Sequence, residues 1–138
     1  MSENSSKLQI KSKRPLSPHL QIYKPQITSV MSILHRLTGA FLSLGSLVMA
    51  YWFYAAAYDM ESYEFVYNCF TSIIGRIALI AWSAAFYYHL CNGIRHMFWD
   101  MGKGFELDAL RRTGLMVLAV SSILTSATWY YILFAVKN

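Results

Sequence analysis

The stretch that decides the fold of this chain is SILHRLTGAFLSLGSLVMAYWFYAAAY, residues 32–58. It contains a single arginine and no acidic residue, and similar apolar runs cover residues 70–97 and 113–136. Each run exceeds the ~20 residues that an α-helix needs to cross a hydrocarbon layer ~30 Å thick. The sequence therefore predicts an all-α integral membrane protein: an arm over residues 1–31, then a domain over residues 32–138 with three transmembrane helices in these ranges.

The composition supports this class. Of the 138 residues, 56% are hydrophobic and 14% are charged, and the mean hydropathy is +0.34. Soluble domains carry about a quarter charged residues, so this chain has too few charges to cover a water-facing surface. We interpret the net charge of +5 as a sign of topology and of contact with anionic lipid. Nucleic-acid binding is not expected, because no soluble basic patch is interleaved with aromatic residues.

The basic residues predict the orientation. The loop after the first run, residues 59–64, has acidic residues but no lysine or arginine. Basic residues precede the first run and surround the loop after the second: Lys7, Lys11, Lys13, Arg14, Lys24, Arg95, Lys103, Arg111 and Arg112. The positive-inside rule then places the N-terminus and the second loop on the cytoplasmic or matrix side. Since residues 1–31 resemble no signal or transit peptide, we expect a multi-pass protein of the bacterial cytoplasmic membrane, with the mitochondrial inner membrane as the alternative.

Two clusters of ionisable side chains interrupt the apolar runs, SILHRLTG at residues 32–39 and HLCNGIRH at residues 89–96. A charged side chain inside a bilayer costs on the order of 2.5–3.5 kcal/mol even on lenient scales, so two clusters call for a common functional reason. Spacings of three and four predict a shared helix face for Ser32, His35, Arg36 and Gly39, and another for His89, Gly93 and His96. The predicted orientation brings both faces to one level in the inner half of the membrane.

His89 is the deepest of the histidines. A neutral imidazole at that depth can ligate haem iron, and Gly93 leaves room for a flat macrocycle or a neighbouring helix. From the residues alone, ligation and a hydrogen bond within a helix interface are equally supported. His35 is the only internal candidate for a second ligand, but Arg36 would then lie close to the iron, so a partner subunit is the simpler source. His19 receives no role.

Ser32 and Arg36 suggest a second kind of site. A hydroxyl and a guanidinium near the inner interface could donate hydrogen bonds to a quinone carbonyl. Taken alone, these two residues are better explained by Ser32 as a helix N-cap and Arg36 reaching lipid phosphates. The basic side chains of His35, Arg36 and His96 also suit haem propionates.

Four segments carry a family resemblance: RPLSPHL (14–20), IYKP (22–25), SILHRLTG (32–39) and HLCNGIRHMFWD (89–100). Together they resemble the cytochrome b556/b560 membrane subunits of succinate dehydrogenase, respiratory complex II. The similarity extends from Arg14 to the C-terminus.

The resemblance implies a place in a multi-subunit helical bundle and a set of sites. His89 would be one axial ligand of a single haem b, and a second, smaller anchor subunit would supply the other histidine. The residues near the haem propionates would be His35, Arg36 and His96. The ubiquinone pocket would be lined by Ser32, Ile33 and Arg36, and the proline-rich arm would contact the iron–sulfur subunit.

The implied activity belongs to the whole complex. Succinate would be oxidised on a flavoprotein subunit, and electrons would pass through the iron–sulfur subunit to ubiquinone at this membrane anchor. We therefore expect no independent activity from this chain and no catalytic residue in it. The alternatives are an anchor of a quinol–fumarate reductase and a haem-free structural anchor.

Overall fold

The computed structural model describes residues 26–135, which form four α-helices and a closing π-helical turn. The elements are α2 (Ile27–Tyr58), α3 (Met60–Thr71), α4 (Ile73–Asp100), α5 (Leu107–Tyr130) and η1 (Tyr131–Ala135). Three helical spans, Ile27–Tyr58, Ile73–Asp100 and Leu107–Phe134, are long and apolar enough to cross a membrane. The predicted all-α membrane fold is thereby confirmed. Most of the predicted arm lies outside the described residues.

The helices extend beyond the apolar runs at one end of the bundle. α2 begins at Ile27 rather than at Ser32, and α5 begins at Leu107 rather than at Thr113. Hydropathy marks only the part of a helix that lies in lipid, whereas the helix itself continues until a cap or a glycine ends it. Sequence reasoning based on hydropathy therefore finds the span and underestimates the helix.

A Schellman motif ends α4. Gly102 takes a left-handed conformation with φ 75°, which glycine adopts without steric cost. The Gly102 N–H donates to the Trp99 carbonyl at 2.8 Å, and the Lys103 N–H donates to the Phe98 carbonyl at 3.0 Å. These two bonds satisfy carbonyls that would otherwise lack partners at the helix end, and they turn the chain towards α5.

The acidic segment after α2 is helical, which the sequence did not predict. Asp59 caps the N-terminus of α3: its carboxylate accepts hydrogen bonds from the Ser62 hydroxyl at 2.6 Å and the Ser62 N–H at 3.3 Å. These bonds hold the pKa of Asp59 below its ordinary value, the side-chain bond contributing most. Ser72 caps α4 in the same manner by accepting from the Gly75 N–H at 3.0 Å. Two N-caps thus make a separate short helix between two spans.

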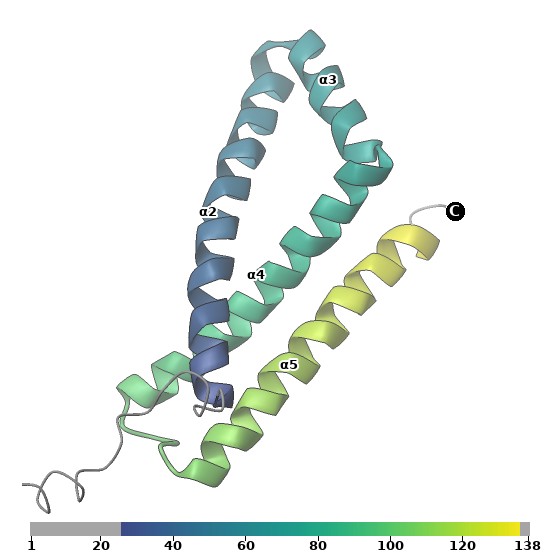
Figure 1. Ribbon diagram of the computed structural model, residues 1–138. Helices are drawn as coiled ribbons and strands as arrows, with labels where there is room; N and C mark the ends of the chain where they lie inside the picture. The colour runs from purple at the N-terminus through teal and green to yellow at the C-terminus, as the bar shows by residue number, and fades with distance from the viewer. Residues whose placement is uncertain (1–25, 136–138) are drawn as a thin grey trace, which may run out of the picture.

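The three spans meet at one end of the bundle. Figure 1 shows α2 and α4 close together where α2 begins and diverging towards α3, while α5 follows α4. Following the predicted orientation, we call the end with Ile27, Asp100 and Leu107 the inner end. The core lies towards this end and takes one large side chain from each span: Met31, Tyr88 and Val117. The Tyr88 hydroxyl also donates to the Met31 carbonyl at 2.9 Å.

Candidate functional site

His89 projects from α4 towards α2 and makes its hydrogen bonds with one ring nitrogen only. Its Nδ1 lies 3.1 Å from the His35 carbonyl oxygen and 3.2 Å from Thr38 Oγ1. A carbonyl can only accept, so Nδ1 carries the hydrogen and Nε2 carries the lone pair. Within residues 26–135, nothing hydrogen-bonds Nε2. The side chain is therefore held in the form in which an imidazole can ligate a metal.

Two further imidazoles complete a histidine cluster, which we define as His35, His89 and His96. The rings of His35 and His89 are stacked, with centroids 3.9 Å apart and planes inclined by 10°. The His96 ring lies 5.0 Å from His35 at an inclination of 35°. His35 Nδ1 is buried and has no hydrogen-bond partner in the described part of the chain. A buried polar atom without a partner is costly, so the cluster leaves a place for a polar group from outside.

The cluster does not form a metal site by itself. No group of three or more histidine, cysteine or acidic side chains within the described residues is arranged to hold a metal ion. Parallel stacking also places the His35 ring against a face of the His89 ring. In this arrangement the two imidazoles would not both bind the iron of one haem, so His89 would be the single ligand from this chain.

The residues predicted to share one face of α2 divide between two faces. His35 and Gly39 point towards α4, since a Cβ added at Gly39 would lie 3.1 Å from His89 Cε1. Arg36 is exposed, and it lies about 100° around the helix from His35. Ile33 is 57% exposed. The structure therefore brings His35, His89 and His96 together and leaves Ile33 and Arg36 on the outer surface of the chain.

Ser32 is not the N-cap of α2. The helix begins at Ile27, and Gln26 occupies the cap position. Thr38 and Ser43 donate to carbonyls one turn back, but the Ser32 hydroxyl has no hydrogen bond among residues 26–135. Ser32 and Arg36 lie one turn apart on α2, so both present polar groups that the described chain does not engage.

Arg95 is buried, although its position beside the second loop predicts a loop charge. It is 5% exposed, its Nε donates to Thr113 Oγ1 at 3.0 Å, and its Nη2 donates to the Leu110 carbonyl at 2.9 Å. Nη1 lies 3.4 Å from Asn92 Oδ1, and the guanidinium lies 4.2 Å from the Trp99 ring centroid. We call these five residues the arginine cluster. The spacing of Tyr88, Asn92 and Arg95 at four and three residues is the sequence signal for this buried face.

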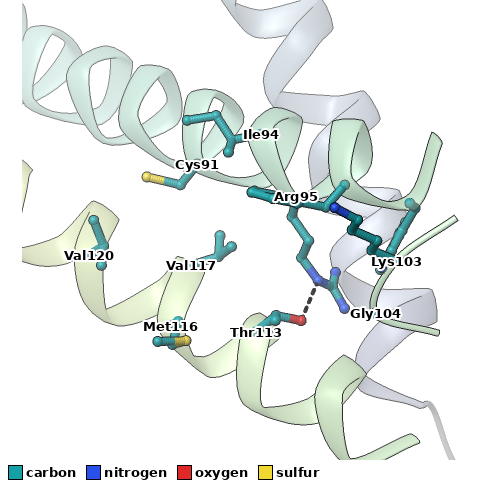
Figure 2. A pocket seen from close by; sticks show the side chains of 11 residues that line it. Cys91, Ile94, Arg95, Lys103, Gly104, Thr113, Met116, Val117 and Val120 are labelled. Carbon is teal, nitrogen blue, oxygen red and sulfur yellow. Dashed lines mark hydrogen bonds between the residues drawn. The ribbon is translucent and has the colours of Figure 1, made fainter. Parts of the chain in front are cut away.

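A cavity of about 470 Å³ lies beside the arginine cluster, between α4 and α5. Figure 2 shows Arg95 reaching across one end of it to Thr113, with Val117, Val120 and Cys91 along the rest of its wall. The cavity lies on the α5 side of α4, whereas the histidine cluster lies on the α2 side. It is therefore separate from the candidate site.

The fold and the site define a class: a helical membrane protein with three spans that gathers histidines between two of them. The chain matches the family described as succinate dehydrogenase/fumarate reductase transmembrane subunit over residues 10–128, and it belongs to that family. This confirms the resemblance seen in its motifs.

Named relatives agree with the family assignment. The chain is 47% identical over 124 residues to the succinate dehydrogenase cytochrome b556 subunit of Rickettsia felis, covering 90% of this chain and 97% of the relative. It is 38% identical over 120 residues to the cytochrome b560 subunit of Marchantia polymorpha, covering 83% and 88%. Identity to the b556 subunit of Paracoccus denitrificans is 34% over 115 residues, with the same coverage.

Proposed function

We propose that this chain is the haem b- and quinone-binding membrane anchor of a succinate:ubiquinone oxidoreductase. The observation that carries the proposal is the His89 imidazole, whose Nδ1 is engaged by α2 while Nε2 stays free. The relatives named as cytochrome b556 and b560 subunits support the same reading.

The haem would be shared between two subunits. His89 would supply one axial ligand, and a second small anchor subunit would supply the other, because the stacking of His35 on His89 removes the internal candidate. His35 and His96 would face the propionates, a role that suits the unpartnered Nδ1 of His35. Arg36 is exposed on another face of α2, so its side chain would have to extend around the helix to reach the propionates. When bound, the haem supplies one-electron redox chemistry, and the residues of this chain hold and orient it.

The quinone would bind at the exposed surface of α2 near the inner end. Ser32 and Arg36 would donate hydrogen bonds to a quinone carbonyl, where negative charge develops as the ring is reduced. Ile33, exposed beside them, would contact the apolar part of the ring. Since this surface is open in the single chain, a neighbouring subunit would complete the pocket.

The remaining partners would be the iron–sulfur subunit, reached through the arm, and the flavoprotein subunit that oxidises succinate. The arm lies outside the described residues, so this contact remains a prediction from the motifs. The predicted membrane is the bacterial cytoplasmic membrane, in line with the Rickettsia and Paracoccus relatives. The second anchor subunit and lipid would cover the apolar side chains that the spans expose.

The test is the reduced-minus-oxidised spectrum of the complex purified in mild detergent. We expect His89→Leu to remove the haem b absorbance while the other subunits still co-purify. Phe86→Leu serves as the matched control, because Phe86 is exposed on the same helix and its ring contacts that of Tyr87. An unchanged spectrum in His89→Leu would reject the ligand assignment, and a wild-type complex without the haem b bands in its difference spectrum would identify a haem-free anchor.

The family description also names fumarate reductase, so the direction of the reaction needs its own measurement. The purified wild-type complex should reduce ubiquinone with succinate faster than it reduces fumarate with a quinol. The opposite ratio would identify the anchor of a quinol–fumarate reductase.

A further inference from the structure

We propose that Thr38 is a positioning residue that holds the His89 imidazole in the tautomer and orientation required for ligation through Nε2. This inference rests on the proposed function, because Thr38 gains this role only if His89 binds the haem iron. Thr38 belongs to α2 and lies one turn along the helix from His35, on the side that faces α4.

The direction of the hydrogen bond follows from the acceptors around Thr38. Its hydroxyl has a single hydrogen, and two carbonyl oxygens lie within reach: Leu34 at 2.8 Å and His35 at 3.0 Å. Since carbonyls only accept, the Thr38 hydrogen goes to one of them. Thr38 Oγ1 then has lone pairs left for His89 Nδ1 at 3.2 Å. Both groups that face Nδ1, Thr38 Oγ1 and the His35 carbonyl, thus act as acceptors for one N–H.

The position of the His89 ring is defined by its neighbours on α2. Gly39 brings bare backbone against the ring, and the His35 ring stacks on one face of it at 3.9 Å. Thr38 and Gly39 follow His35 by three and four residues, which places all three on the side of α2 that meets α4. Together they form a seat that contacts the imidazole at Nδ1, at Cε1 and on one face, and that leaves Nε2 open.

Such a seat should influence both the affinity and the redox properties of the haem. A second hydrogen-bond partner at Nδ1 orients a ligating histidine and raises its basicity. Loss of such a partner typically costs about 10–100-fold in metal affinity. Thr38→Val removes the oxygen but keeps the shape and the His35 carbonyl, so we expect the lower end of that range. A more basic imidazole favours ferric over ferrous iron, so the haem reduction potential should rise in the variant.

The experiment compares Thr38→Val, Thr38→Ser and Thr125→Val in the intact purified complex. Thr125 is the matched control, since its hydroxyl donates to the Ser121 carbonyl on α5 at 2.8 Å and does not reach the histidines. The measurements are haem content per complex, the potential by spectroelectrochemical titration and the low-spin ferric signal by electron paramagnetic resonance. A tenfold loss of affinity for the ferric haem, with the affinity for the ferrous haem unchanged, would raise the reduction potential by about 59 mV in this one-electron couple.

We expect Thr38→Val to show the upward shift and an altered ferric signal, and Thr38→Ser and Thr125→Val to match the wild type. Wild-type potential and signal in Thr38→Val would overturn the inference, as would an equal shift in Thr125→Val. Should Thr38→Val accumulate poorly, Thr38→Ala makes the same test without placing a methyl group where the hydroxyl was. His89→Leu separates the two hypotheses: if it keeps the haem, the ligand assignment in the proposed function fails, and if it loses the haem while Thr38→Val is unaltered, only the role of Thr38 fails.

Discussion

The two polar clusters of α4 are neighbours in sequence and opposites in character. Arg95 points towards α5, is 5% exposed and donates hydrogen bonds to Thr113, Leu110 and Asn92. His96, the next residue, belongs to a cluster that is half-buried and keeps a buried ring nitrogen without a partner in the described chain. Polar groups that hydrogen-bond within the chain hold its helices together. Polar groups that are left open are the ones available to a ligand.

Free energy explains why one helix carries both kinds. Unengaged polar groups inside a membrane are costly, so a stable chain needs compensation elsewhere. The arginine cluster supplies hydrogen bonds from α4 to α5, and its Nη1 also lies 3.8 Å from Met31 Sδ on α2. Among the buried side-chain atoms of this cluster, Asn92 Nδ2 alone lacks a partner within the described residues. We therefore expect substitutions in the arginine cluster to affect stability and substitutions in the histidine cluster to affect redox function.

The largest expected effect is that of Arg36→Leu on quinone reduction. Loss of a donor that stabilises developing negative charge costs on the order of 100-fold in rate. Reduction of a soluble dye by succinate should remain at the wild-type level, because Arg36 is exposed and holds no other described residue in place. Arg76→Leu, an exposed arginine at the far end of α4, is the control. Equal loss of both activities would indicate misassembly and would break the comparison.

Arg95→Met should destabilise the protein by about 2 kcal/mol, or about 30-fold in the folded-to-unfolded ratio. The reason is that the Leu110 carbonyl would lose its charged hydrogen-bond donor. The measurement is the thermal midpoint of the purified complex. Lys103→Met is the matched control, since Lys103 lines the same cavity and is exposed. A wild-type midpoint in Arg95→Met would show that the arginine cluster does not hold the helices.

A pair of glycine substitutions sharpens the comparison with smaller changes, because each adds one methyl group at a contact between helices. A Cβ at Gly39 would lie 3.1 Å from His89 Cε1, and a Cβ at Gly114 would lie 2.8 Å from Met31 Sδ. We expect Gly39→Ala to shift the haem spectrum with little change in thermal midpoint. Gly114→Ala should lower the midpoint and leave the spectrum unchanged. An exchange of these two phenotypes would contradict the division between the clusters.

The smallest expected effect is that of Ser32→Ala. Loss of one hydrogen bond to quinone is worth about 1 kcal/mol, or about fivefold in the apparent KM for ubiquinone, with kcat nearly unchanged. Ser43→Ala serves as the control, because the Ser43 hydroxyl is occupied by the Gly39 carbonyl at 2.9 Å. Wild-type kinetics in Ser32→Ala would remove this residue from the quinone site.

Much of the fold was predictable because it depends on properties that add up along the chain. An apolar run long enough to cross the bilayer predicts a span wherever its neighbours lie, so all three spans were found. The helix α3 was missed because its signal is local capping by Asp59 rather than hydropathy. The inner ends of α2 and α5 were predicted too short because the predicted bounds followed the long apolar runs, whereas local backbone capping decides where a helix begins.

The candidate site was predictable only to the level of its helices. Spacing placed His89 and His96 on one helix face, the predicted orientation brought that face level with the face of His35, and the structure brings the three rings together. Spacing could not separate His35 from Arg36, which the structure directs to different surfaces. It also could not reveal Thr38, whose contact with His89 crosses 51 positions of the sequence.

By itself, the sequence determined that this is a protein of three membrane spans, which of its ionisable residues fall within those spans and to which family it belongs, because hydropathy and motif identity reside in single residues and their order. Only the tertiary structure decided which arginine is buried, which imidazole nitrogen is free and which hydroxyl faces it. Those properties depend on how far apart two helices lie and how each is rotated about its axis, and these are set by the packing of many side chains at once.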